Sequence, residues 1–169
     1  LQTNKARQAM ELAQAIHSVD RPKLATTLAR LADEVGETVL LTRLVDDTVV
    51  CIERCEGAKQ LVRLSYERGS RLPINAGASA LTLLAWLPEK EIRELLGRHG
   101  LQRFTERTLT DVDVLVQRLA EIRSAGYGMT VAEVDPDATG IAAPIFDDSG
   151  AVAAALSIVA IRRRVPEDR

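Results

Sequence analysis

The chain has 169 residues, a formal net charge of −2, and 46% hydrophobic and 27% charged residues, which suits one globular domain with a single core. Only 3% of the residues are aromatic and the one concentrated basic run is Arg162–Arg164, so base stacking and DNA binding by this chain alone are disfavoured. No apolar run reaches the ~18 residues of a membrane span and no secretory signal is recognisable, so we expect a cytoplasmic protein without membrane contact.

Two helices are predicted at the start of the chain. Apolar residues recur at helical spacing within Asn4–Ile16 and again from Leu24 to Val35. Asp20 is a suitable N-cap for the second helix and Gly36 a suitable end. The first helix precedes every predicted strand and has no evident partner in the core. We therefore expect residues 1–19 to stand apart from a domain formed by residues 20–169.

Six strands are predicted in two groups of three, with short turns between them. The first group is Glu37–Val45, Thr48–Arg54 and Gln60–Tyr66, and the second is Tyr127–Glu133, Ile141–Phe146 and Ala151–Ile161. Asp147–Gly150 carries the turn chemistry of a hairpin. The last strand is apolar on both faces, which places it inside the sheet and covered on both sides. Neighbouring strands joined by short turns pair antiparallel.

Three further helices are predicted between the two groups of strands. The first runs from Asn75, its expected N-cap, to Trp86, and Pro88 opens the second. Thr110 and Asp113 approximate a capping box for the third, whose inner face is Val112, Leu115, Val116, Leu119 and Ile122. Strand groups interrupted by helices indicate an α+β domain.

Several of these segments together resemble a known family. A Thr-rich helix entry, a Gly-Tyr pair, an acidic loop, an Ala-Ala-Pro strand and a DxxG hairpin occur within Arg103–Gly128 and Gly126–Ala160, and the likeness extends to Arg68–Pro88. The combination resembles the C-terminal effector-binding domain of the IclR family of bacterial transcription regulators, from about Leu24 onward. The resemblance implies a GAF-like domain with an antiparallel sheet of about six strands flanked by helices.

The same resemblance has implications for the whole protein. In the family, a helix at residues 1–19 links the effector domain to a winged helix-turn-helix domain that binds DNA. No such domain is recognisable in these residues and the chain opens without Met, so we expect a fragment that reaches DNA only through the missing part. Family members form dimers, commonly paired into tetramers, which implies a homo-oligomer. Whether the regulator represses or activates is left open.

The stretch from Asn75 to Ala80 is the most informative local feature, because small residues stand at a helix start. Backbone N–H groups without helical partners, together with the helix dipole, favour a bound anion such as a carboxylate. Alternatively, small residues let the helix pack tightly on the sheet. The resemblance favours the first interpretation, because family members bind small effectors beside this helix start.

The resemblance also implies which positions form the effector pocket. They are Gly77, Ala78, Ser79, Thr130, Gly140, Ser157 and Val159. In members that bind glyoxylate or pyruvate, the last four are typically Asp, Cys, Ser and Ser, and only Ser157 matches. The changes remove polar partners, and Gly140 is expected to free volume. We therefore expect a small organic acid that is larger or more apolar than glyoxylate.

Other chemistry finds little support in the sequence. Ser65, Ser79, Ser124 and Ser157 lack a GxSxG setting, neither histidine has a visible acidic partner, and no phosphate loop is present, so we expect no enzyme, no cofactor and no metal site. Cys51 and Cys55 lie roughly 13 Å apart on a straight strand, too far for a disulfide. Two interpretations remain open for Arg63, Arg68 and Arg71: they bind an acidic ligand, or they are solvated on the surface. The neighbouring carboxylates Glu133 and Asp135 are explained by solvation in a loop at the end of a strand. A free-standing GAF-like sensor that controls another output is the alternative function.

Overall fold

The computed structural model describes residues 21–57 and 66–161. In this part of the chain, the elements follow one another as α2 (Arg21–Val35), β1 (Thr38–Val45), β2 (Thr48–Cys55), β3 (Arg71–Leu72), α3 (Ala78–Ala85), α4 (Glu89–His99), α5 (Val112–Ala125), β4 (Gly128–Val131), β5 (Ala138–Phe146) and β6 (Val152–Ile161). The predicted helix Asn4–Ile16, residues 60–65 of the third predicted strand and the basic run Arg162–Arg164 lie outside the described residues.

The described strands form one sheet with the order β3-β2-β1-β6-β5-β4, and all the described pairings are antiparallel. The two predicted groups of strands therefore meet where β1 pairs with β6. The predicted α+β fold with an antiparallel sheet of about six strands is confirmed. The edge strand β3 was not predicted, because two residues before a proline carry no strand pattern.

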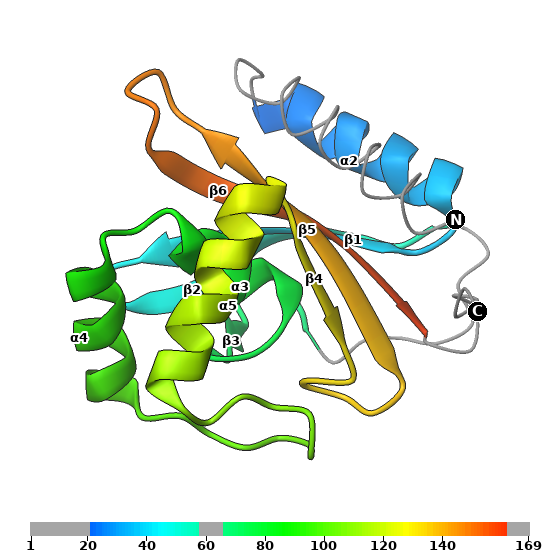
Figure 1. Ribbon diagram of the computed structural model, residues 1–169. Coiled ribbons are helices and arrows are strands. Elements are labelled where there is room, and N and C mark those ends of the chain that lie inside the picture. Colours follow the sequence, from blue (N-terminus) through cyan, green and yellow to red (C-terminus); the bar gives the residue numbers. More distant parts are fainter. Residues whose placement is uncertain (1–20, 58–65, 162–169) are drawn as a thin grey trace.

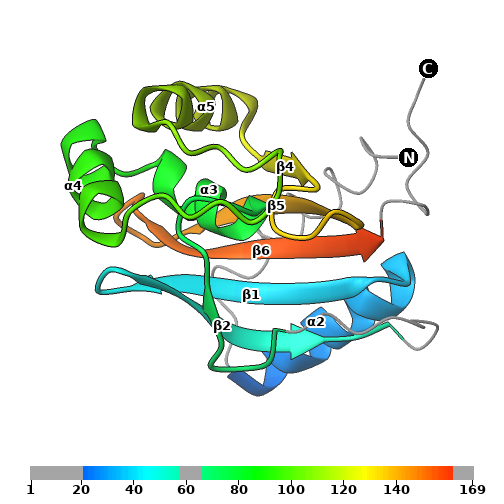
Figure 2. The ribbon, with the colours of Figure 1, turned by 90° about the horizontal axis from the view of Figure 1, so that it is seen from below.

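Helices cover both faces of the sheet (Figure 1, Figure 2). Helix α2 packs against β1 and β2 on one face, α3 packs against β5 and β6 on the other, and Figure 2 shows α4 and α5 farther from the sheet than α3. The side chains of β6 alternate accordingly. Leu156 and Ile158 pack into the core beneath α2, whereas Ala155 packs against Ala80 and Leu83 of α3. This double coverage explains why β6 is apolar on both faces.

Helix α3 is buried on every side, because it lies between the sheet and α5. Its close approach to β4 requires a glycine. A Cβ atom at Gly128 would lie 2.5 Å from Oγ1 of Thr82. This contact lies outside the Asn75–Ala80 stretch and therefore does not decide between the two interpretations of that stretch.

Both predicted N-caps in the middle of the chain are wrong. Helix α3 begins after Gly77, which has a φ of 87° and no side-chain cap, while the buried Asn75 amide donates to the carbonyls of Gln102 and Leu109 at 3.0 and 3.1 Å. Asn75 thus fixes a loop whose carbonyls would otherwise be unpaired. Helix α5 is capped by the Asp111 carboxylate, which accepts from the N–H groups of its first turn.

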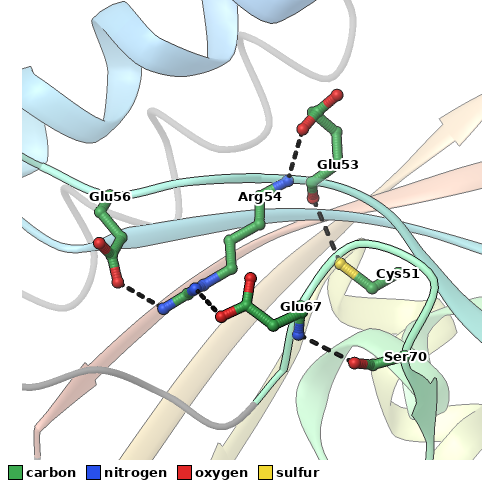
Figure 3. A network of polar contacts seen from close by, with 6 residues as sticks. All are labelled: Cys51, Glu53, Arg54, Glu56, Glu67 and Ser70. Carbon is green, nitrogen blue, oxygen red and sulfur yellow. Dashed lines mark hydrogen bonds and ion pairs between the residues drawn. The ribbon is translucent and has the colours of Figure 1, made fainter.

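The far end of β2 carries a polar network around the largely buried Arg54 (Figure 3). Its guanidinium pairs with Glu56 and, at 3.0 Å, with Glu67, and the Cys51 thiol donates to the carbonyl of Glu53. Burial raises the pKa of the Cys51 thiol, with a further contribution from the Glu53 charge. Cys51 and Cys55 are both free, as predicted. The network therefore gives the largely buried Arg54 guanidinium acidic partners at the edge of the sheet.

Candidate functional site

A cavity of about 250 Å³ lies between the start of α3 and the sheet. The predicted pocket residues that line it are Gly77, Ala78, Ser79, Thr130, Gly140 and Val159. The strand register explains how residues distant in sequence meet here. Thr130 of β4 pairs with Gly140 of β5, and Gly140 pairs with Val159 of β6, so the three form one row on the face that α3 covers.

Ser157 is the one predicted pocket residue that does not line the cavity. It is completely buried, and its hydroxyl accepts a hydrogen bond of 2.8 Å from the hydroxyl of Ser79. Ser157 therefore touches the cavity only through Ser79, whose position on α3 it fixes. Its expected direct contact with an effector has no counterpart in the lining of the cavity.

The start of α3 presents unpaired donors to the cavity. The N–H of Leu81 is bonded to the carbonyl of Gly77 at 3.2 Å, but those of Ala78, Ser79 and Ala80 have no partner within the described ranges. Opposite them lies Thr130, whose hydroxyl is open to the cavity and makes no hydrogen bond to another described side chain or carbonyl. Helix-start N–H groups and an open hydroxyl can all donate, so this arrangement is suited to a ligand with acceptor atoms.

Gly140 leaves less room than the sequence led us to expect. A Cβ atom at this position would lie 3.2 Å from the Cβ atom of Ala78 and 3.4 Å from Oγ1 of Thr130. Part of the volume that a larger side chain would fill is thus taken by α3 itself. The glycine allows the helix start to approach the sheet as closely as it does.

Sequence reasoning missed Glu133, whose carboxylate reaches the start of α3. Its Oε2 atom accepts from the N–H of Gly77 at 3.3 Å, and its side chain borders the cavity. Burial raises the pKa of Glu133, although the Gly77 hydrogen bond and the Arg118 charge act in the opposite direction. Solvation in a loop, the explanation offered by the sequence, fits the exposed Asp135 and not this half-buried side chain.

The backbone before Glu133 explains why no pattern revealed it. Ala132 has a φ of 57°, in the left-handed region, which breaks the strand alternation directly after β4. Threonine hydroxyls hold the turn: Thr105 donates to the carbonyl of Ala132 and Thr108 to that of Glu133, both at 2.6 Å. The direction of Glu133 is thus fixed by contacts with a loop 25 residues earlier in the chain.

The remaining lining residues are mostly apolar, with one tyrosine and one further acidic residue. They comprise Leu40, Leu72, Pro73, Ala76, Ala80, Val134 and Ala138 together with Tyr66 and Asp135. Burial and the nearby Asp135 charge raise the pKa of Tyr66. No Lys or Arg occurs among the lining residues of the described part, and Arg68 and Arg71 are exposed on the surface, with Arg68 paired to Glu53.

Within the two described ranges, no group of three or more His, Cys, Asp or Glu side chains is arranged to hold a metal ion. His99 lies 3.2 Å from Asp47, at the turn between β1 and β2, and not at the cavity. None of the helices in the described ranges is long and apolar enough to cross a membrane. The polar groups that border the cavity are backbone N–H groups at the start of α3, hydroxyls, and the side chains of Glu133 and Asp135.

Comparison with known proteins agrees with this architecture. The family model "Bacterial transcriptional regulator IclR C-terminal" matches residues 13–169. The HTH-type transcriptional repressor AllR of Klebsiella pneumoniae is 37% identical over 142 residues, which cover 84% of this chain and 52% of that protein. The chain thus spans about half the length of the curated relatives it matches.

Solved structures show the same fold. The C-terminal domain of the Escherichia coli transcriptional regulator KdgR is 31% identical, with a TM-score of 0.75 over 85% of this chain and 83% of that one. A second structure is the inducer-binding domain of the transcription factor PobR from Acinetobacter, a double mutant in complex with 3-hydroxybenzoic acid. It is 27% identical, with a TM-score of 0.77, and the match covers 88% of this chain and 87% of that one.

Proposed function

Because the chain belongs to the IclR family of bacterial transcriptional regulators, as an effector-binding domain, we propose that it senses a small organic acid in the cavity at the start of α3. Binding of this effector changes how the regulator associates with itself or with DNA. In this proposal residues 20–169 form the sensing domain and residues 1–19 lead toward the part of the regulator that binds DNA in the bacterial cytoplasm.

The observation that supports the proposal best is the convergence of separate segments on one cavity. Of the seven positions that the family resemblance implies, all except Ser157 border the same cavity. The unpaired N–H groups of Ala78 and Ser79 and the unpaired hydroxyl of Thr130 face it together. A carboxylate supplies the acceptor atoms that all three groups lack.

The lining favours an acid larger or more apolar than glyoxylate. The row formed by Thr130, Gly140 and Val159 offers one hydroxyl where a very small 2-oxo acid needs several polar partners. A buried polar group without a partner costs about 1–3 kcal/mol. Leu40 and Leu72 instead offer apolar surface to a ring or chain. The PobR domain with bound 3-hydroxybenzoic acid supports an aromatic acid as one candidate.

The relatives also support a regulatory output. AllR proteins are named as transcriptional repressors, and we propose repression of target genes as the basal state, relieved by the effector. A ligand that binds two arrangements of an oligomer unequally shifts their populations. We propose a homodimer or a dimer of dimers as the assembly in which this shift occurs.

A thermal-shift screen of the protein with aliphatic and aromatic carboxylic acids tests the proposal. A ligand at ~100 times its dissociation constant stabilises the fold by about 2.7 kcal/mol, which shifts the melting temperature visibly. A larger acid should raise the melting temperature, and Ser79→Trp, which fills the cavity, should abolish the shift. Stabilisation by glyoxylate or pyruvate alone would contradict the proposed ligand class.

A further inference from the structure

Glu133 occupies part of the place that an acidic effector needs. Its carboxylate accepts from the N–H of Gly77, directly before the unpaired N–H groups of Ala78 and Ser79. The helix start therefore already has an internal anion. Thr130, which is only 6% exposed, has a hydroxyl without a partner in the described part of the chain, so the neighbouring part of the site remains open.

The charges around the cavity further disfavour the binding of an anion. Asp135 is a second acidic residue of the lining, and among the described lining residues no cation balances it. Arg118 acts on Glu133 from the direction of α5 and borders a separate groove. A ligand carboxylate placed on the N–H groups of α3 thus meets the Glu133 carboxylate, and two like charges at short range cannot both remain ionised without a large cost.

We propose that Glu133 makes the cavity select uncharged head groups, so that a carboxylic acid binds only together with one proton that it shares with Glu133. This inference rests on the proposed sensing function and names the form of the ligand. Binding thus combines the ligand carboxylate, the Glu133 carboxylate and one proton taken from solvent. In the complex, the two carboxyl groups together carry a single negative charge. An amide of the same shape needs no proton, since its NH₂ group donates to the Glu133 carboxylate.

The other titratable and charged groups near Glu133 do not take over the role of this proton, which is to neutralise one of the two carboxylates. The titratable and charged residues of the two hollows that it borders are Tyr66, Asp135, Arg107, Arg118 and Glu121. Burial raises the pKa of both Glu133 and Tyr66, so Tyr66 stays neutral in the range in which Glu133 titrates. The arginines lie on the outer side, where Glu121 pairs with Arg118.

Two pairs of ligands that share their shape test the inference: 3-hydroxybenzoate with 3-hydroxybenzamide, and acetate with acetamide. Each is titrated into the wild-type protein and into Glu133→Gln at about pH 5 and about pH 8, while NMR follows the amide signals of Ala78 and Ser79. If one proton is taken up, the wild-type dissociation constant for the carboxylate rises about tenfold per pH unit above the pKa values of Glu133 and of the ligand, and in the same range that for the amide stays constant.

Glu133→Gln keeps an acceptor for Gly77 and removes the charge. It should bind the carboxylate at least about tenfold more tightly than the wild type does at the higher pH, with a flat pH profile. Asp137→Asn, a change to an exposed acid of the same loop that does not line the cavity, should keep the wild-type profile. Equal affinities of wild type and Glu133→Gln for the carboxylates overturn the inference, and so does absence of binding to both proteins. The sensing function is tested separately by the thermal-shift screen, whose panel of acids extends beyond these ligands.

Discussion

The hydroxyls of Ser79 and Ser157 lie 2.8 Å apart and join the helix that borders the cavity to the central strand of the sheet. Both side chains are buried, and Ser157 is completely so. This bond is the polar contact that sets how far α3 stands from β6 at the cavity. It also gives the first of four predictions.

Ser157→Ala should destabilise the domain by about 1–3 kcal/mol, because it leaves the buried Ser79 hydroxyl without its acceptor. Ser79→Ala combined with Ser157→Ala should cost less than the sum of the single changes. Urea unfolding of the four proteins measures this cycle. Ser124→Ala, on the exposed face of α5, should change the free energy of unfolding by less than about 0.5 kcal/mol. Strict additivity in the cycle would show that the two hydroxyls do not interact.

Gly128→Ala should destabilise the domain by about 1–3 kcal/mol, since its Cβ atom would lie 2.5 Å from Oγ1 of Thr82 and must push α3 away from β4. Gly97→Ala is the matched control. No atom lies within 4 Å of the Cβ position there, and the residue is inside α4, so the change should stabilise by about 0.5–1 kcal/mol. Thermal melts of both variants compare them directly, and a neutral Gly128→Ala would contradict the close contact.

Asp111→Ala should cost about 1 kcal/mol, because the Asp111 carboxylate caps two N–H groups at the start of α5. Thr110→Ala tests the capping box that the sequence predicted. Its hydroxyl accepts from the exposed Arg103 and caps no N–H group, so the free energy of unfolding should change by less than about 0.5 kcal/mol. If chemical denaturation showed that Thr110→Ala destabilises the domain more than Asp111→Ala does, the predicted capping box would be correct.

The stability of the domain should depend on pH through Glu133. Its pKa in the folded state is raised, so the folded protein holds this proton more tightly than the unfolded chain does. The contribution to stability is complete below the pKa of an unfolded glutamate and is lost as the pH rises through the folded value. Glu133→Gln should therefore be more stable than the wild type at neutral pH, with the advantage disappearing under acidic conditions.

Melting temperatures from about pH 4 to about pH 8 check this prediction, with Asp135→Asn as the comparison. The Asp135 side chain is exposed, so this variant should follow the wild-type curve. A constant difference between Glu133→Gln and the wild type over the whole range would mean that the Glu133 carboxyl titrates alike in both states.

Much of the fold could be predicted because the responsible signals are local. The apolar stripe of α2, the left-handed Gly36 at its end and the Asp147–Gly150 turn each specify their element within a few residues. The two-sided apolar pattern of β6 placed it inside the sheet. The two-residue β3 was missed, because it depends on pairing with β2 and not on any pattern of its own.

The positions Thr130, Gly140 and Val159 came from the family resemblance, and the strand register of the structure brings them into one row. Glu133 could not be found this way. Its direction depends on the left-handed Ala132 and on threonines from a distant loop. The wrong cap at Asn75 has the same origin, since its side chain serves carbonyls about thirty residues away.

The pairing of β1 with β6 has a consequence for how the domain forms. Thr42 and Ala155 are partners in the centre of the sheet and stand 113 residues apart in sequence. During synthesis, β1 must wait for nearly the whole domain before its inner edge is covered, whereas β5 and β6 can form their hairpin at once. Loop closure over such a distance slows folding. Until then, the unpaired edge of β1 is where a nascent chain is most exposed to pairing with a neighbour.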